Sequence, residues 1–254
     1  MTGELAGKTA LVTGASRGIG AATAITLAKN GVSRVVLHYN GYKQGAEEAQ
    51  AAVKAAGAQA DIIGGDLSTP GGIQTFIDTL KATAPKVDIL INNAGHLVKR
   101  EKLVEMSFDT YDRVMDLNVK SVWFISQAVA PHMIEQKSGV IINLSSIAAR
   151  NGGGPGATMY AAAKAAVATI TKGMAKELAP LGIRVNAVSP GTVDNYFHEK
   201  YSTRQMLDGM LASTPAGRLG TNEEIADTIL FLCSDASRYI YGQTIEINGG
   251  MYMV

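Results

Sequence analysis

A tyrosine followed four residues later by a lysine occurs three times in the chain, and each pair could move a proton. The pairs are Tyr39/Lys43, Tyr160/Lys164 and Tyr196/Lys200. On a helix, residues four apart share one face, so the lysine ammonium lies where it can stabilise the tyrosine phenolate. A phenol held this way can act as general acid or base at a carbonyl group. The chemistry indicated is proton transfer by general acid/base catalysis.

The setting of Tyr160 and Lys164 separates them from the other two pairs. Tyr160 begins a predicted helix and follows a predicted strand that ends in LSS. Tyr39 instead ends a strand, and Tyr196 lies in an irregular segment without a serine-bearing strand before it. Lowering a tyrosine pKa from about 10 to about 7 requires about 4 kcal/mol. One cation at ~4 Å supplies about that much, and burial opposes it. One lysine is therefore marginal, and a second positive charge beside Lys164 would be needed.

A glycine-rich turn, TGASRGIG over residues 13–20, joins the first predicted strand to the first helix. Gly14, Gly18 and Gly20 allow a sharp turn and a close approach of the backbone to a pyrophosphate. The helix N-terminus offers free N–H groups and a partial positive charge. Because the turn follows a strand and opens a helix in the first βαβ unit, it predicts a dinucleotide site.

The residues after the second strand favour NADP(H) over NAD(H). NAD sites usually carry an acid there, but this chain has Tyr39 and no carboxylate before Glu47. Arg17 and Lys43 supply cations nearby, which favours a cofactor with a 2′-phosphate. NAD(H) stays open, because both cations could be solvated surface charges. Asp66, at the end of the third strand, could accept from the adenine amino group or cap the next helix.

Short apolar runs alternate with helical patterns along the whole chain. Strands are predicted over 9–13, 34–39, 60–66, 87–93, 139–146, 183–189 and 243–248. Helices are predicted from the glycine turn to about 30, then over 43–57, 72–83, 107–135, 158–179 and 222–234. Strands in which apolar and polar residues do not alternate, and which are each followed by a helix, indicate a parallel α/β sheet with helices on both faces. We predict a single domain over residues 1–254, with ligands at the carboxyl ends of the strands.

Segment 192–216 interrupts this alternation and carries aromatic and methionine side chains. Such an adaptable apolar set suits a lid over a substrate pocket, or packing against a neighbouring subunit. His96, just after NNAG, is either a substrate contact or a structural loop histidine.

The composition excludes several classes of protein. Charged residues make up 18%, below the roughly 25% of typical soluble domains, which favours an oligomer. A net charge of +1 argues against nucleic-acid binding. The single cysteine excludes an internal disulfide and a Cys-rich metal site. We see neither a secretory signal nor an apolar run of ~20 residues, and expect a cytoplasmic protein without a membrane partner.

Several motifs in this order resemble the short-chain dehydrogenase/reductase family. They are TGASRGIG, NNAG (92–95), Asn118, a serine followed by YAAAK (160–164), and PG (190–191). The resemblance covers essentially the whole chain. It implies a Rossmann-like, doubly wound, seven-stranded parallel sheet, a nicotinamide cofactor and a homotetramer.

The resemblance also implies roles for individual residues. Tyr160 would be the acid/base, Lys164 its partner, Ser146 the hydroxyl that orients the carbonyl, and Asn118 the holder of a relay water. Ser145 stays open as the alternative serine. The implied cofactor residues are Gly14, Ser16, Arg17, Gly18, Ile19, Gly20, Tyr39, Asn40, Asp66, Leu67, Asn93, Ala94, Gly95, Tyr160, Lys164, Pro190, Gly191 and Val193. The candidate substrate contacts are His96, Ser146, Tyr160 and Tyr196.

We therefore predict an NADP(H)-dependent oxidoreductase acting on a small carbonyl compound or secondary alcohol, without a metal. A 3-oxoacyl thioester, a sugar or polyol, and a small ketone are all open as substrates. The alternatives are an NAD(H)-dependent sugar or polyol dehydrogenase and a non-catalytic module that senses the cofactor.

Overall fold

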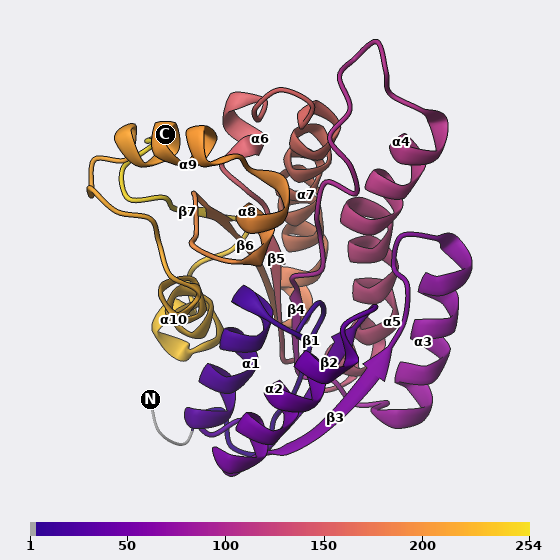
Figure 1. The fold of residues 1–254 in the computed structure, drawn as a ribbon. Coiled ribbons are helices and arrows are strands. Elements are labelled where there is room, and N and C mark those ends of the chain that lie inside the picture. Colours follow the sequence, from indigo (N-terminus) through magenta and orange to yellow (C-terminus); the bar gives the residue numbers. More distant parts are fainter. Residues whose placement is uncertain (1–3) are drawn as a thin grey trace.

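A seven-stranded parallel sheet runs through the centre of the protein, in the order β3-β2-β1-β4-β5-β6-β7 (Figure 1). The computed structural model describes residues 4–254, so the first three residues of the expected domain lie outside the described residues. The strands are β1 (Thr9–Val12), β2 (Arg34–Tyr39), β3 (Gln59–Gly64), β4 (Ile89–Asn92), β5 (Gly139–Leu144), β6 (Ile183–Pro190) and β7 (Thr244–Ile247). The predicted sheet is confirmed. The winding reverses between β1 and β4, which is where such folds bind ligands.

Helices cover both faces of the sheet (Figure 1). One layer consists of α1 (Gly18–Lys29), α2 (Lys43–Ala55) and α10 (Asn222–Cys233), and the other of α3 (Pro70–Thr83), α5 (Ser121–Glu135) and α7 (Thr158–Leu178). Leu27 and Ile229 are buried in the first layer, and Phe76 and Ile125 in the second. The central strands β4 and β5 are buried along their whole length, as the sequence indicated, whereas the edge strands β3 and β7 include polar residues such as Asp61 and Glu246.

The helix predicted over 107–135 is interrupted in its middle. It consists of α4 (Phe108–Met115), a π-helical turn (Asp116–Lys120) and α5. A π turn holds one more residue than an α turn, and such turns occur frequently at functional sites. The interruption contains Asn118, whose side chain is completely buried.

The structure corrects the prediction that segment 192–216 is irregular. It forms two short helices, α8 (Tyr196–Tyr201) and α9 (Arg204–Ala212). The side chain of Asn195 accepts from the N–H of Phe197, and that of Thr203 accepts from the N–H of Met206, so both helices are capped. Figure 1 shows both helices, in orange, at the carboxyl edge of the sheet. Also unpredicted are α6 (Ala148–Asn151) and the 3₁₀ turns Ala179–Leu181 and Asp235–Ser237.

Candidate active site

A cleft of about 680 Å³ opens at the carboxyl ends of β1, β4, β5 and β6. Among the predicted site residues, all but Tyr39, Asp66 and Asn118 line it. The cleft extends from the glycine turn to the loop after α6. The helix α8 lies between them, with Tyr196 on Arg17 and the Tyr201 carbonyl accepting from Arg100. Its size and elongated lining fit a dinucleotide with a small molecule beside it.

The glycine turn is packed against the end of β4. The Asn93 side-chain amide donates to the carbonyl oxygens of Thr13 (2.8 Å) and Gly14 (3.0 Å). A Cβ on Gly20 would collide with the Gly14 carbonyl oxygen, so only glycine fits there. The close packing leaves the N-terminus of α1 facing the cleft, as pyrophosphate binding requires.

His38 was missed as a cofactor-site residue, although it directly precedes the predicted Tyr39. Its Nδ1 accepts from the Gly14 N–H at 3.0 Å, and its Nε2 lies 3.0 Å from the Gly65 carbonyl oxygen. Burial lowers the pKa of His38 to about 4, so the ring is neutral and donates from Nε2. His38 therefore ties the glycine turn to the end of β3. Tyr39, the expected contact, packs instead against Gly64.

Asp66 does not cap α3, because the Thr69 hydroxyl does so by accepting from the Gly72 N–H. One Asp66 carboxylate oxygen accepts from the N–H (2.9 Å) and the hydroxyl (2.7 Å) of Ser68. Its carboxylate is thus held in a local turn beside the cleft, while Leu67 lines the cleft.

The guanidinium of Arg17 lies between two tyrosine rings. Its central carbon is 3.7 Å from the centre of the Tyr42 ring and 4.0 Å from that of Tyr196. Tyr196, predicted as a substrate contact, therefore lies at the glycine turn, whereas Tyr42 was not predicted at all. Lys43, the second predicted cation, pairs with Glu47 at 3.3 Å and lies outside the cleft lining.

Ser146, Tyr160 and Lys164 come together on the opposite wall, where β5 ends and α7 begins. Ser145 donates its hydroxyl to the Lys164 carbonyl oxygen at 2.9 Å and is buried. Ser146 lies close enough to Tyr160 for its hydroxyl to lower the pKa of the phenol. The Lys164 ammonium lies 5.6 Å from the centre of the Tyr160 ring and donates to the Leu144 carbonyl oxygen at 2.8 Å. This geometry favours Ser146 over Ser145 as the reactive hydroxyl.

Burial shapes the acid–base properties of this group. It raises the pKa of Tyr160 to about 12, against the smaller effect of the Ser146 hydrogen bond. It lowers the pKa of Lys164 to about 8. At neutral pH the phenol is therefore protonated and ready to donate, and the ammonium is still mostly charged. Removing the phenol proton at neutral pH requires a further positive charge nearby.

Lys164→Met is expected to raise thermal stability at pH 7. Between pH 8 and 10.5 the unfolded chain keeps a proton that folded Lys164 releases, so stability rises with pH there. The buried charge is thus a cost below pH 8, and methionine removes it. We expect a Tm gain of a few degrees at pH 7, at about 2–4 °C per kcal/mol, shrinking towards pH 10. Calorimetry across this range measures it; a constant or negative difference would contradict the prediction.

Asn118 lies behind Gly95, just outside the cleft lining. Its amide donates to the carbonyl oxygens of His96 (3.0 Å) and Val114 (2.9 Å), while its buried Oδ1 has no partner. A Cβ on Gly95 would lie 2.5 Å from that Oδ1 and 2.7 Å from the Lys164 Nζ. The two polar atoms therefore face the same small space, and only glycine keeps it open.

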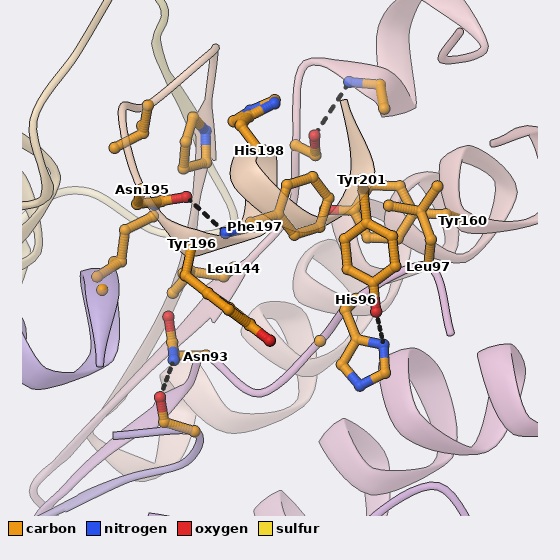
Figure 2. Close-up of a pocket in the computed structure, with 18 of the residues that line it drawn as sticks. Asn93, His96, Leu97, Leu144, Tyr160, Asn195, Tyr196, Phe197, His198 and Tyr201 are labelled. Carbon is orange, nitrogen blue, oxygen red and sulfur yellow. Dashed lines mark hydrogen bonds between the residues drawn. The ribbon is translucent and has the colours of Figure 1, made fainter. Parts of the chain in front are cut away.

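The rings of Phe197 and Tyr201, both from α8, lie beside Tyr160 (Figure 2). Phe197 lies 5.8 Å from the Tyr160 ring and 5.3 Å from the Tyr201 ring, between centres. The Tyr201 hydroxyl lies 3.2 Å from the His96 Nδ1. Burial lowers the pKa of His96 to about 4, so it is a neutral part of the wall. Phe197, rather than Tyr196, thus packs against the Tyr160 ring, and Tyr201 packs against Phe197.

Two further features of residues 4–254 bear on the class of protein. No group of three or more His, Cys, Asp or Glu side chains in this range is placed to hold a metal ion. The helices of the same range include none long and apolar enough to cross a membrane.

The fold and the cleft define a nicotinamide-dependent oxidoreductase, because a glycine-turn dinucleotide site shares one cleft with a tyrosine, a serine and a buried lysine. The chain belongs to the short-chain dehydrogenase/reductase family, as its motifs indicated. A family described as enoyl-(acyl carrier protein) reductase matches residues 14–252. The activity of this class is hydride transfer between a nicotinamide dinucleotide and a carbonyl or secondary alcohol.

Individual relatives differ in their substrates. The 3-oxoacyl-[acyl-carrier-protein] reductase of Staphylococcus epidermidis is 42% identical over 246 residues, covering 97% of this chain and 99% of the relative. An NADH-dependent reductase responsible for alginate metabolism is 36% identical, with a TM-score of 0.87 over 98% of this chain and 99% of its own. A candidate NAD(P)-dependent gluconate 5-dehydrogenase from Beutenbergia cavernae, with bound NADP, is 33% identical, with a TM-score of 0.88 over 98% of each chain.

Proposed function

We propose that the protein is an NADP(H)-dependent reductase of a small carbonyl compound, with Tyr160 as the proton donor. The observation that carries this proposal is the convergence of Ser146, Tyr160 and Lys164 at the cofactor cleft. A non-catalytic module that senses the cofactor would not need this group. It also would not need a lysine beside the tyrosine whose buried charge lowers the stability of the fold.

Each side chain has a distinct task in the proposed mechanism. A nicotinamide ring bound in this cleft supplies or accepts the hydride, and its oxidised form carries a positive charge. The Ser146 and Tyr160 hydroxyls hold the substrate oxygen, and Tyr160 donates its proton as negative charge develops there. Lys164 stabilises the resulting phenolate by its charge.

Asn118 and Lys164 are proposed to hold a relay water that returns the proton to Tyr160. The support is the buried, unpartnered Oδ1 of Asn118, which shares a space with the Lys164 ammonium beside Gly95. An ordered water there satisfies both groups, and buried polar atoms are rarely left unpaired. The π turn that holds Asn118 supports this role, because such turns occur frequently at functional sites.

The preference for NADP(H) is proposed to depend on Arg17. Its stacked guanidinium offers charge-assisted hydrogen bonds to a 2′-phosphate, and Asn40 lines the same end of the cleft. We expect Arg17→Gln to lower kcat/KM for NADPH about 10–100-fold and for NADH less than about threefold. Lys43→Gln is the matched control and should change neither, since Lys43 pairs with Glu47. Equal losses for both cofactors in the Arg17 variant would remove the basis for this preference.

The substrate class is tested by measuring NADPH and NADH oxidation with aldehydes, ketones, oxo sugars and 3-oxoacyl thioesters. Steady-state turnover of at least one of these substrate classes supports the proposed function. Binding of NADPH without turnover of any class would instead favour the cofactor-sensing alternative. An NADH preference on sugars would favour the polyol dehydrogenase alternative.

The lid, the homotetramer and a cytoplasmic location are proposed alongside the reaction. The rings of Phe197 and Tyr201 over Tyr160 support a lid over 192–216, which would exclude water during the reaction. Phe108 on α4 and Trp123 on α5 expose apolar rings, which supports a subunit interface on these helices. Light scattering during gel filtration would give the number of subunits.

A further inference from the structure

The cleft is lined by positive charge alone. Its charged residues are Arg17, Arg100, Lys164 and Lys200, and no Asp or Glu side chain is among its lining residues. The whole chain has 23 Lys and Arg against 22 Asp and Glu, so composition does not account for this bias. A cleft with charge of one sign favours ligands of the opposite sign.

The cofactor and the proton relay account for only half of these cations. Arg17 lies at the glycine turn and Lys164 lies beside Tyr160. Arg100 lies away from the glycine turn, between the C-terminal end of α8 and the loop after α6, and Lys200 belongs to that end of α8. Their charge is available to a ligand group that is not part of the dinucleotide.

Arg100 is half-buried and fixed in orientation by two carbonyl oxygens. Its Nε donates to the Tyr201 carbonyl at 2.6 Å, and its first terminal nitrogen donates to the Pro155 carbonyl at 2.9 Å. A guanidinium has five N–H donors, so its second terminal nitrogen keeps both of its own. No carboxylate within residues 4–254 pairs with Arg100 at 4.0 Å or less. A half-buried cation with free, oriented donors and no acidic partner is suited to bind an anion.

We propose that Arg100 binds a carboxylate of the substrate, so that the enzyme reduces oxo acids in preference to neutral ketones. The inference rests on the proposed carbonyl reduction at Tyr160 and names its substrate class. Lys200 is exposed at the rim of the cleft and adds attraction at longer range. The carboxylate would fix the distance between the Arg100 guanidinium and the carbonyl carbon held at Tyr160. It thereby selects one chain length among oxo acids.

The test compares oxo acids with their own ethyl esters, using NADPH and the full-length enzyme. The pairs are 3-oxobutanoate, 4-oxopentanoate and 5-oxohexanoate, each against its ethyl ester, which is neutral but otherwise alike. For wild-type enzyme we expect kcat/KM to favour the acid at least tenfold at one chain length. Arg100→Gln should bring that ratio to within about twofold of unity, because a hydrogen bond to a charged group is lost. A ratio is used because a merely structural role of Arg100 would lower both rates together.

Lys102→Gln is the matched control, since it removes the same charge from the same loop but lies outside the cleft lining. It should leave the acid-to-ester ratio unchanged. If Arg100→Gln does not fold, Arg100→Lys keeps the charge with fewer donors and should lower the ratio only in part.

Equal reduction of acids and esters by wild-type enzyme would overturn this inference and leave the proposed function standing. An unchanged ratio in the Arg100 variants would also overturn it. Acetoacetyl-coenzyme A distinguishes the other source of anionic charge, a phosphate on a thioester carrier. If Arg100→Gln impairs that thioester but spares the acids, the carboxylate assignment is wrong. If wild-type enzyme reduces no acid, ester or thioester, the proposed carbonyl reduction fails together with this inference.

Discussion

Replacing Tyr160 by phenylalanine is expected to lower kcat by about 10²–10⁴-fold, the range typical of a lost general acid. The ring would still pack against Phe197, so the cleft keeps its shape. The Ser146 hydroxyl would remain, but no group with an acidic proton would replace the phenol. Affinity for NADPH should change less than threefold, which fluorescence titration measures. The loss therefore falls on the chemical step and not on cofactor binding.

Tyr39→Phe is the matched control for this experiment. Tyr39 also stands four residues before a lysine, but it lies outside the cleft lining and packs against Gly64. Its variant should retain activity to within about twofold. If Tyr160→Phe kept full turnover of the accepted substrates, the proton donor would have to be another group. The proposed mechanism would then be wrong.

The fold could be predicted almost completely from the sequence, because a parallel sheet covered on both faces leaves a strong pattern. Strands such as β5 are apolar throughout, and each is followed by a helix with its own apolar face. The errors at strand ends have one cause. Asp66, Asn93 and Ser146 continue an apparent strand in sequence but lie beyond its end in the structure. Pattern alone does not distinguish the last paired residue from the first residue of the site.

Strand and helix order also predicted that Tyr160 and Lys164 come together with Ser146, but it did not predict that Tyr196 and Lys200 lie on a helix and line the same cleft. The position of Tyr196 could not be predicted from the sequence. Its ring lies on Arg17, far from it in sequence, and only tertiary packing brings them together. For the same reason Arg100 was not predicted as a site residue. Its donors are bonded to the Tyr201 and Pro155 carbonyls, and no local motif encodes those contacts.

The π turn at Asn118 and the helices α8 and α9 lie beyond sequence reasoning for physical reasons. A π turn inserts one residue without changing the local amino-acid preferences, so the pattern over 107–135 still looks like one α-helix. The helix α8 has six residues and is fixed by its Asn195 cap and by contacts with the cleft. Such short helices have little intrinsic stability.

Gly95→Ala is expected to lower kcat about 100-fold while the protein stays folded. The backbone of Gly95 does not require glycine, since its φ lies outside the left-handed region. The new methyl group, however, would lie 2.5 Å from the Asn118 Oδ1 and 2.7 Å from the Lys164 Nζ. Two hydrogen bonds hold the Asn118 amide, so the flexible end of Lys164 has to move. Displacement of a positioned catalytic group by about 1 Å can cost about 10²-fold in rate.

The pH dependence distinguishes this cause from a general loss of structure. With Lys164 displaced, the Tyr160 phenolate loses part of its stabilisation, so the apparent pKa for alcohol oxidation should rise relative to wild-type enzyme. Gly41→Ala is the matched control, because Gly41 also lines the cleft but a Cβ there would meet nothing within 4 Å. That variant should retain activity to within about twofold. If the Gly95→Ala enzyme had a lowered kcat but an unshifted pH profile, displacement of Lys164 would not be the cause of the loss. One with wild-type kcat would show that the space shared by Asn118 and Lys164 is not needed for proton transfer.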